Sequence, residues 1–294
     1  MLSIETNNPE TSDTARRFGG TARLWGDVGL NALQTAHAVV IGIGGVGSWA
    51  AECLARSGVG HITLIDLDVI APSNVNRQIH AQDSTFGANK CDVMAQRIAG
   101  YAPHCMVSVI DDWITPENVA RLVPASAGVV LDCIDQVAAK TALTVLCRAR
   151  SQALIVCGAA GGKTDLSLLA TADLAHVTHD PLLASLRTRL RKQHGFAGAP
   201  KKHTDKTKVM GVPCVFVSQA VAKPLNAGGN EHAVNELALG KPTAAPQGLS
   251  CAGYGSMMHM TASMGLRAAG WALERLKISV SKQVFQDKRL KTSA

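Results

Sequence analysis

Short apolar runs alternate with longer stretches of helical character along the first half of the chain. The runs fall at residues 37–43, 61–68, 106–111, 127–135 and 153–160. Each run is short enough for a strand, and the stretches between them are long enough for crossover helices. Strands that alternate with helices are typical of βαβ units. The pattern therefore predicts an α/β fold with a Rossmann-like, doubly wound and mostly parallel sheet.

The pattern changes after residue 161. Two further apolar stretches, 164–174 and 212–220, flank a basic segment, and a long helix is expected over about residues 256–277. We expect this C-terminal half, residues 161–294, to extend the sheet begun by residues 16–160 and to belong to the same domain. Residues 1–15 are polar and mixed, and we expect them to be disordered.

A glycine-rich turn separates the first predicted strand from the helix after it. Gly42, Gly44 and Gly47 form a G-x-G-x-x-G motif, with Gly45 inside it. Without Cβ atoms, the backbone of such a turn can approach phosphate closely, and the N-terminus of the following helix favours negative charge. The motif predicts a nucleotide site, and a turn that serves packing alone is the alternative.

Two aspartates follow at the end of the second predicted strand. Asp66 comes 19 residues after Gly47, and Asp68 lies two residues further on. A carboxylate at the first of these positions accepts hydrogen bonds from ribose hydroxyls in nucleotide-binding folds. We therefore expect both aspartates to belong to the nucleotide site.

Charged and amide side chains at other strand ends bear on whether the nucleotide is ATP or NAD. They are Asn74, Asn76, Arg77 and Gln78 after the second strand, Lys90 at the start of the next helix, and Asp135 at the end of the fourth strand. In a doubly wound sheet these ends meet in one crevice. Hydride transfer needs little charge beside the phosphates. Breaking the α–β bond of ATP needs cationic groups and usually Mg²⁺, held by carboxylate or phosphate oxygens. The set favours an adenylating site, although each residue alone is equally explained as a surface charge or a helix cap. The alternative function, a nicotinamide-dependent oxidoreductase, leaves the set unexplained.

The net charge points to an anionic partner. The chain of 294 residues carries +7, and residues 186–208 hold eight Lys or Arg against one Asp, which is +7 for that segment alone. A concentrated basic stretch is typical of a nucleic-acid contact, although a solvated loop can have the same composition.

The eight cysteines indicate neither a zinc site nor disulfides. No two of them have C-x-x-C spacing, and several lie inside apolar runs. Such thiols are typical of small buried residues in a reducing compartment, so we expect a cytoplasmic protein and structural roles for Cys214 and Cys251. No signal peptide is recognisable. Residues 242–266 lack Asp, Glu, Lys and Arg but contain loop-forming residues, so no membrane span is expected.

Several stretches together resemble the ubiquitin-activating (E1-like) adenylation superfamily, which includes the ThiF and MoeB enzymes. They are GIGGVGS, DLDVIAPSNVNRQ, GANK and LDCID, and the resemblance spans residues 16–160. It implies an ATP-binding domain that adenylates a carboxylate and forms a homodimer. Carried over by position, it implies that Asp66 holds the ribose, that Asn74, Arg77 and Lys90 contact the phosphates, that Asp135 holds Mg²⁺, and that Arg17, or else Arg23, reaches the neighbouring subunit's ATP.

A narrower resemblance, to the tRNA threonylcarbamoyladenosine dehydratases (TcdA, also called CsdL), runs nearly end to end. Its stretches include RFGGTARLWG, NRQIHA, GAAGGKTD, CAGYGSMM and, most specifically, DPLLASLRTRLRKQHG. It implies a ligase-type, AMP-forming enzyme that cyclises N6-threonylcarbamoyladenosine (t6A) at position 37 of tRNA to cyclic t6A through adenylation of the threonyl carboxylate. It also implies that the basic segment contacts tRNA, through Arg187, Arg189, Arg191, Lys192, Lys201 and Lys202.

Besides the nicotinamide-dependent oxidoreductase, two alternatives stay open at this stage. An E1-like enzyme that activates a ubiquitin-like sulfur carrier would adenylate a protein C-terminus, but such relatives usually carry two C-x-x-C zinc pairs, which this chain lacks. The other alternative is a non-catalytic nucleotide-sensing or scaffold protein. Family members are associated with a cysteine desulfurase and its sulfur-acceptor protein, so the resemblance also implies a sulfur-relay partnership.

Overall fold

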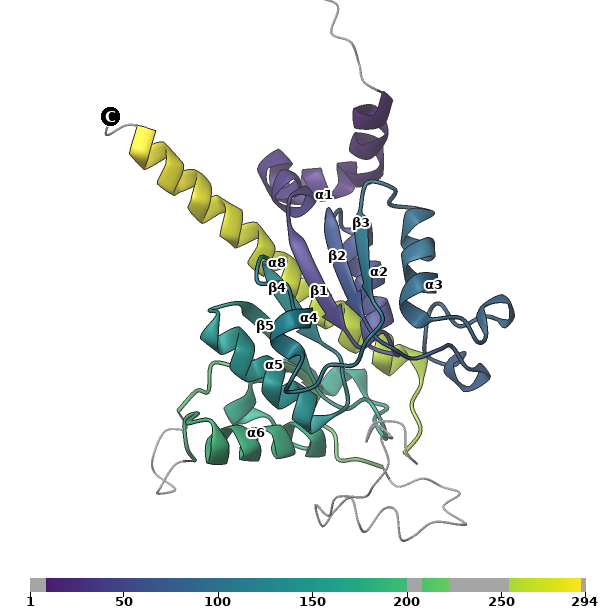
Figure 1. Cartoon of the computed structure of the whole chain (residues 1–294), viewed down its shortest axis with the longest axis vertical. Coiled ribbons are helices and arrows are strands. Elements are labelled where there is room, and N and C mark those ends of the chain that lie inside the picture. The colour runs from purple at the N-terminus through teal and green to yellow at the C-terminus, as the bar shows by residue number, and fades with distance from the viewer. Residues whose placement is uncertain (1–8, 200–207, 223–253, 292–294) are drawn as a thin grey trace, which may run out of the picture.

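The computed structural model describes residues 9–199, 208–222 and 254–291. These residues contain one sheet of seven strands in the order β3-β2-β1-β4-β5-β7-β6. Figure 1 labels the first five strands in this order, from β3 to β5. The strands are β1 (His37–Ile41), β2 (His61–Ile65), β3 (Met106–Ile110), β4 (Val129–Asp132), β5 (Ala153–Cys157), β6 (Leu169–Asp173) and β7 (Pro213–Val217). Neighbouring strands are parallel except β6 and β7, which are antiparallel. The predicted sheet is confirmed, and so is its extension by the C-terminal half, because β7 pairs with β5.

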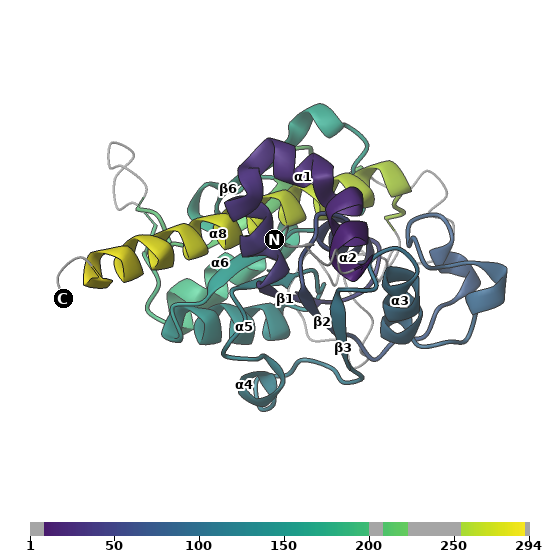
Figure 2. The ribbon, with the colours of Figure 1, turned by 90° about the horizontal axis from the view of Figure 1, so that it is seen from above.

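Helices cover both faces of the sheet (Figures 1 and 2). On one face lie α1 (Pro9–Gln34), α2 (Gly47–Arg56), α3 (Lys90–Ala99) and α8 (Met258–Lys291), and on the other lie α4 (Val119–Leu122), α5 (Val137–Ala149) and α6 (Pro181–Gln193). Along β1, Val40 is buried in the core under α1, α2, α3 and α8, whereas Val39 and Ile41 are buried in the core under α4, α5 and α6. Successive side chains of a strand point to opposite faces, so a strand covered on both sides is apolar throughout.

The N-terminal helix corrects one prediction. α1 begins at Pro9, so the disorder predicted over residues 1–15 is wrong for residues 9–15, while residues 1–8 lie outside the described part of the chain. Arg17 connects this helix to the segment after α3, because its guanidinium pairs with Asp13 one turn earlier at 2.6 Å and donates to the Tyr101 carbonyl at 3.0 Å. Phe18 is buried next to it. At the other end of the chain, α8 continues to Lys291, well past the predicted end near residue 277.

Cysteine burial agrees with a structural role for these thiols. The cysteines among the described residues are free thiols, and most are buried. Cys214 is fully buried, and that burial raises the pKa of its thiol, which disfavours the nucleophilic thiolate. Cys251 lies outside the described residues. None of the helices in the described ranges combines the length and apolarity needed to cross a bilayer.

A stacked histidine pair at the start of β1 and β2 predicts that stability falls in mild acid. The rings of His37 and His61 lie 3.6 Å apart and nearly parallel, and His37 Nε2 hydrogen-bonds Thr63 Oγ1 at 2.8 Å. Burial, with the neighbouring His61, lowers the pKa of His37 to about 4. The ordinary value is about 6.5, so the unfolded chain binds more protons between these two values. The free energy of unfolding is therefore expected to decrease as pH falls from about 6.5 to about 4.

Urea denaturation at a series of pH values measures this effect. A His37→Gln variant keeps a hydrogen-bonding side chain opposite Thr63 but does not titrate, so its unfolding free energy should decrease less over the same window. Equal pH dependence of the variant and the native chain would assign the acid sensitivity to other groups, among them His80, whose pKa burial also lowers to about 4.

Candidate active site

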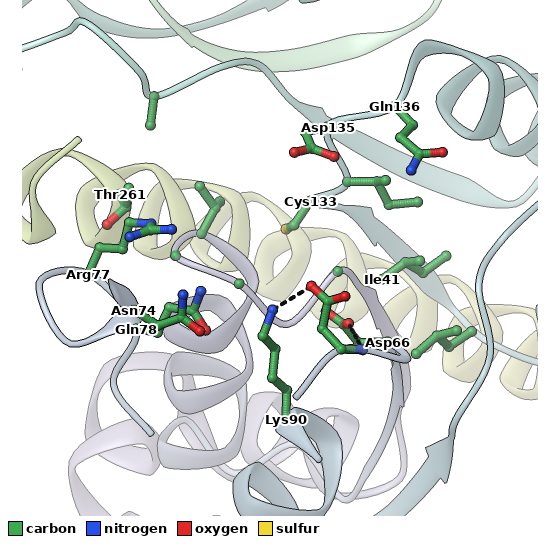
Figure 3. A pocket seen from close by; sticks show the side chains of 18 of the residues that line it. Ile41, Asp66, Asn74, Arg77, Gln78, Lys90, Cys133, Asp135, Gln136 and Thr261 are labelled. Carbon is green, nitrogen blue, oxygen red and sulfur yellow. Dashed lines mark hydrogen bonds and ion pairs between the residues drawn. The ribbon is translucent and has the colours of Figure 1, made fainter. Parts of the chain in front are cut away.

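A cavity of about 490 Å³ opens at the carboxyl ends of the central strands (Figure 3). Most residues predicted for the nucleotide site line it: Gly42, Gly44, Gly45, Asp66, Asp68, Asn74, Arg77, Lys90 and Asp135. Gly47 does not line it and instead begins α2. The loops after different strands therefore bring together residues that are far apart in the sequence, as expected for a doubly wound sheet.

The glycine turn leaves no room for side chains at two positions. Gly42 has a φ of 84°, and a Cβ on it would lie 2.9 Å from the Cys133 carbonyl oxygen. A Cβ at Gly47 would overlap the carbonyl oxygen of Gly42. Gly44 and Gly45 instead face the cavity, with α2 beginning just behind them. The turn thus presents bare backbone and a helix N-terminus to the cavity, which suits a phosphate group.

Asp66 is fixed by backbone donors on both sides. One carboxylate oxygen accepts from Ile43 N at 2.5 Å, and the other accepts from Asp68 N at 2.9 Å. Burial raises the pKa of Asp66, although the Lys90 ammonium and these donors oppose the shift. Each carboxylate oxygen has two lone pairs, so Asp66 keeps the capacity to accept from a ligand hydroxyl.

Lys90 is held at the cavity wall by an ion pair. Its ammonium lies 2.6 Å from an Asp68 carboxylate oxygen (Figure 3), and its side chain is only 7% exposed while that of Asp68 is 49% exposed. The lysine begins α3, whose N-terminus is capped by Asn89 through Cys91 N at 2.8 Å. A positive charge buried next to the glycine turn is therefore fixed in place before any ligand arrives.

Arg77 lies across the glycine turn. A Cβ on Gly45 would lie 3.2 Å from Arg77 Cγ, so the arginine stem covers that glycine. The guanidinium donates to the Ser73 carbonyl at 2.7 Å and to Asn76 Oδ1 at 2.9 Å. Asn74 orders the same loop by accepting from Ala71 N at 3.0 Å. Asn76 does not itself line the cavity but donates to the carbonyl of Ser256, which does.

The fourth strand is shorter than predicted, and the correction involves Asp135. β4 ends at Asp132, and Asp135 lies in the turn that follows, half-buried and lining the cavity. The turn is set by Ile134 N, which donates to Asp132 Oδ1 at 3.1 Å. In the described ranges no group of three or more His, Cys, Asp or Glu side chains could hold a metal ion alone. Asp135 therefore fits a metal only as one carboxylate ligand that acts together with oxygens of a bound phosphate, which is a common way to hold Mg²⁺.

A buried ion pair that sequence reasoning missed lies beneath this turn. Lys140 on α5 places its ammonium 3.0 Å from Asp132 Oδ1 and 2.8 Å from the Cys157 carbonyl oxygen, and both charged side chains are fully buried. Burial raises the pKa of Asp132 against the effect of the neighbouring ammonium. In the sequence VAAKTAL, Lys140 looks like an ordinary surface lysine, so no pattern indicates its role.

A second missed group joins the cavity rim to α6. Asp180 caps α6 by accepting from Leu183 N at 3.0 Å, and its other oxygen accepts from Ala159 N at 2.9 Å. A side chain at Gly158 would overlap this carboxylate. The ammonium of Lys163, buried nearby, donates to the carbonyl of His179, just before the cap. The start of α6 is therefore fixed beside the cavity, and Leu182 on its first turn lines it.

The basic residues predicted to contact tRNA have unequal freedom on α6. Arg187 donates to the carbonyls of Leu174 and Val177, and Arg191 donates to that of Ala197, so both also hold backbone segments. Arg189 is half-buried and Lys192 is exposed. Lys201 and Lys202 lie outside the described residues.

Arg17 does not lie at the site of its own chain. Its guanidinium binds the carbonyl of Tyr101, which follows the C-terminus of α3 and so lies near the amino ends of the strands. The cavity lies at their carboxyl ends. Residues that do line the cavity but were not predicted for it include Trp113 and Thr261.

The chain is similar to known proteins over most of its length. A model of the ThiF family matches residues 19–292. The tRNA threonylcarbamoyladenosine dehydratase of Escherichia coli strain K12 is 42% identical over 269 residues, which cover 91% of this chain and 96% of that protein. Crystal structures of the Escherichia coli enzyme, TcdA, in complex with ATP and in complex with AMP each have a TM-score of 0.77 and 37% identity, and each comparison covers 96% of this chain and 100% of the other.

Proposed function

The chain belongs to the ThiF family, and on that premise we propose that it is an ATP-dependent tRNA threonylcarbamoyladenosine dehydratase of the ligase type that forms AMP. The single observation that carries the proposal is the cavity in which a glycine turn, Arg77, Lys90 and Asp135 meet at the strand ends. Its support is the 42% identity, over nearly the full length of both chains, to an enzyme of that name.

ATP fits the cavity through groups that are already in place. The turn of Gly44 and Gly45 offers backbone to the phosphates, Arg77 and Lys90 offer positive charge beside it, and Asp66 offers carboxylate oxygens to the ribose. Preorganised charges act most strongly where negative charge develops, and here that is on the phosphates as the α–β bond breaks. The chain's own residues therefore orient the nucleotide and stabilise the pyrophosphate as it leaves.

The proposed reaction converts an unreactive acid into a mixed anhydride, from which AMP can be displaced. The threonyl carboxylate of t6A attacks the α-phosphorus of ATP, which forms an acyl-adenylate and releases pyrophosphate. The carbamoyl group of the same side chain then attacks the acyl carbon, a five-membered ring closes, and AMP leaves with the carboxylate oxygen. The second step is intramolecular, so correct positioning supplies much of its acceleration and no enzyme nucleophile is needed.

Asp135 is the proposed magnesium ligand. Mg²⁺ would supply charge neutralisation on the phosphates. If this is so, Asp135→Asn, which replaces a charged ligand by a neutral one, should raise the Mg²⁺ concentration needed for half-maximal activity by at least about tenfold. Pyrophosphate release, measured against Mg²⁺ concentration with t6A-containing tRNA, tests this.

Asp112→Asn is the matched control for Asp135. Asp112 also lines the cavity, but its carboxylate pairs with Arg121 at 3.3 Å. Exposed ion pairs contribute little to stability, so the variant should fold normally. Its Mg²⁺ requirement should stay within about twofold of native. An unchanged Mg²⁺ requirement in Asp135→Asn would exclude this carboxylate as the ligand.

The remaining parts of the proposal concern assembly and location. We propose that the basic face of α6 contacts tRNA, since the helix begins at the cavity and carries the half-buried Arg189 and the exposed Lys192. We also propose a homodimer in which Arg17 acts at the ATP of the partner subunit. In its own chain Arg17 lies near the amino ends of the strands, away from the cavity at their carboxyl ends. A cytoplasmic location and a sulfur-relay partnership with a cysteine desulfurase and its acceptor follow from the family resemblance alone.

One incubation tests the function directly. The purified chain is mixed with ATP, Mg²⁺ and tRNA that carries t6A, the RNA is digested, and its nucleosides are analysed by mass spectrometry. The expected product is a modified adenosine lighter by one water molecule, formed together with AMP and pyrophosphate. The control is the same tRNA without t6A. AMP formation with a carrier protein that ends in Gly-Gly, but not with t6A-containing tRNA, would support the sulfur-carrier alternative instead.

A further inference from the structure

A second cavity lies at the amino ends of β5 and β7, at the opposite end of these strands from the ATP cavity. It has a volume of about 430 Å³ and is lined by Ala153 and Pro213, the first residues of β5 and β7. Side chains from α5 and α8, which cover different faces of the sheet, complete its walls. The proposed adenylation chemistry does not use this cavity, because the carboxyl ends of the strands lie away from it.

The charged residues in its lining are all cationic, and they lie among aromatic and aliphatic residues. The guanidinium of Arg148 lies 4.2 Å from the ring centre of Phe196, and that of Arg275 lies 4.9 Å from the ring centre of Trp271. All four residues line the cavity, and none of the described residues that line it is an Asp or a Glu. Flat guanidinium groups held against rings favour a ligand that is both planar and anionic.

The walls of this cavity are held in place without any ligand. The Asp173 carboxylate accepts from the backbone N–H groups of Met210, Gly211 and Val212 at 2.7–3.0 Å, which fixes the segment that forms one wall. On another wall, Gln152 donates to two backbone carbonyls, whereas its buried Oε1 has no partner among the described residues.

α6 connects the two cavities. Its first turn lines the ATP cavity through Leu182, and Phe196, three residues after its end, lines the second cavity. A helix of 13 residues is about 20 Å long. Arg189 and Lys192 lie on the second half of this helix, toward the end that leads to the second cavity.

We propose that the second cavity binds a nucleotide of the tRNA substrate, outside the nucleotide that reacts, with its phosphate at Arg148 and Arg275 and its base against Trp271. The inference rests on the proposed function, because it assumes an RNA substrate. Single-stranded and looped RNA is commonly recognised by such a combination of aromatic rings, guanidinium planes and charge. The two cavities would then hold one tRNA at two points, which fixes its orientation at the reacting base.

The test compares tRNA binding by the native chain and by Arg148→Gln/Arg275→Gln. The double variant should bind t6A-containing tRNA about tenfold more weakly at about 0.15 M salt, and its salt dependence should become shallower by about 1 for each phosphate that the arginines no longer neutralise. The rate of cyclisation at saturating tRNA and the KM for ATP should not change. Arg56→Gln is the matched control. Arg56 lies on α2, outside the second cavity, and its side chain is 55% exposed. This variant should bind tRNA like the native chain.

A cross-linking experiment makes the test independent of folding in the variants. Photo-activated tRNA that carries 4-thiouridine should cross-link to peptides that contain Phe196 or Trp271 in the native chain. Native tRNA affinity in the double variant, or cross-links confined to the ATP cavity, would overturn the proposal. If the native chain binds tRNA but does not cyclise t6A, the proposed function fails, whereas cyclisation with unaltered tRNA binding by the double variant refutes the second binding point alone.

Discussion

Arg77→Ala should lower the rate of t6A cyclisation at saturating ATP and tRNA by on the order of 10²- to 10³-fold. Arg77 covers Gly45 and holds its guanidinium at the edge of the glycine turn through Ser73 and Asn76. A preorganised cation next to the phosphates stabilises the charge that develops when pyrophosphate leaves, and a loss of this size is typical for one such group. Single-turnover formation of AMP measures the chemical step without product release.

Arg77→Lys is the control that separates charge from geometry. Lysine keeps the positive charge but has no planar pair of donors for Ser73 and Asn76, so we expect it to recover only part of the rate. Circular dichroism and thermal unfolding should show both variants folded, because the guanidinium hydrogen bonds are on an exposed loop. A rate of AMP formation in Arg77→Ala within about threefold of native would remove Arg77 from the phosphate site.

The sequence predicts the parts of this molecule that depend on local pattern. Strands buried on both faces have to be apolar throughout, which is why residues 37–43 and 61–68 are recognisable as β1 and β2. Gly42 is predictable because the turn needs a positive φ, which glycine adopts without strain. The strand-end residues Arg77, Lys90 and Asp135 are predictable as a group because parallel strands bring their carboxyl ends to one edge.

Interactions between distant segments are what the sequence does not predict. Lys140 and Asp180 look like a helix-surface lysine and an ordinary loop aspartate, and their burial follows from how α5 and α6 pack on the sheet. The sequence also does not predict the contacts of Arg187. It belongs to the basic segment, but its guanidinium donates to two backbone carbonyls. The stretch LDCID predicts a strand that continues to Asp135, whereas the strand ends at Asp132, whose side chain accepts from Ile134 N.

The buried pair gives the largest stability effect we expect. Lys140→Met should lower the free energy of unfolding by about 3–5 kcal/mol, because it leaves the carboxylate of Asp132 buried without its counter-charge. The loss of stability should affect the turn that carries Asp135, because Ile134 N in that turn donates to Asp132 Oδ1. Urea denaturation followed by circular dichroism measures the loss, and Lys192→Met, an exposed lysine on α6, should change stability by less than about 0.5 kcal/mol.

Asp132→Asn/Lys140→Met separates the loss of the ion pair from the loss of its shape. Asparagine keeps an oxygen for Ile134 N, and its amide replaces the carboxylate oxygen that has no partner among the described residues. No charge is then buried, so the double variant should regain most of the stability, because replacing both members of a buried pair is often close to neutral. If Lys140→Met and the double variant unfold at the same urea concentration, the loss comes from the lysine's packing and its hydrogen bond to the Cys157 carbonyl, and the charge of Asp132 is not its cause.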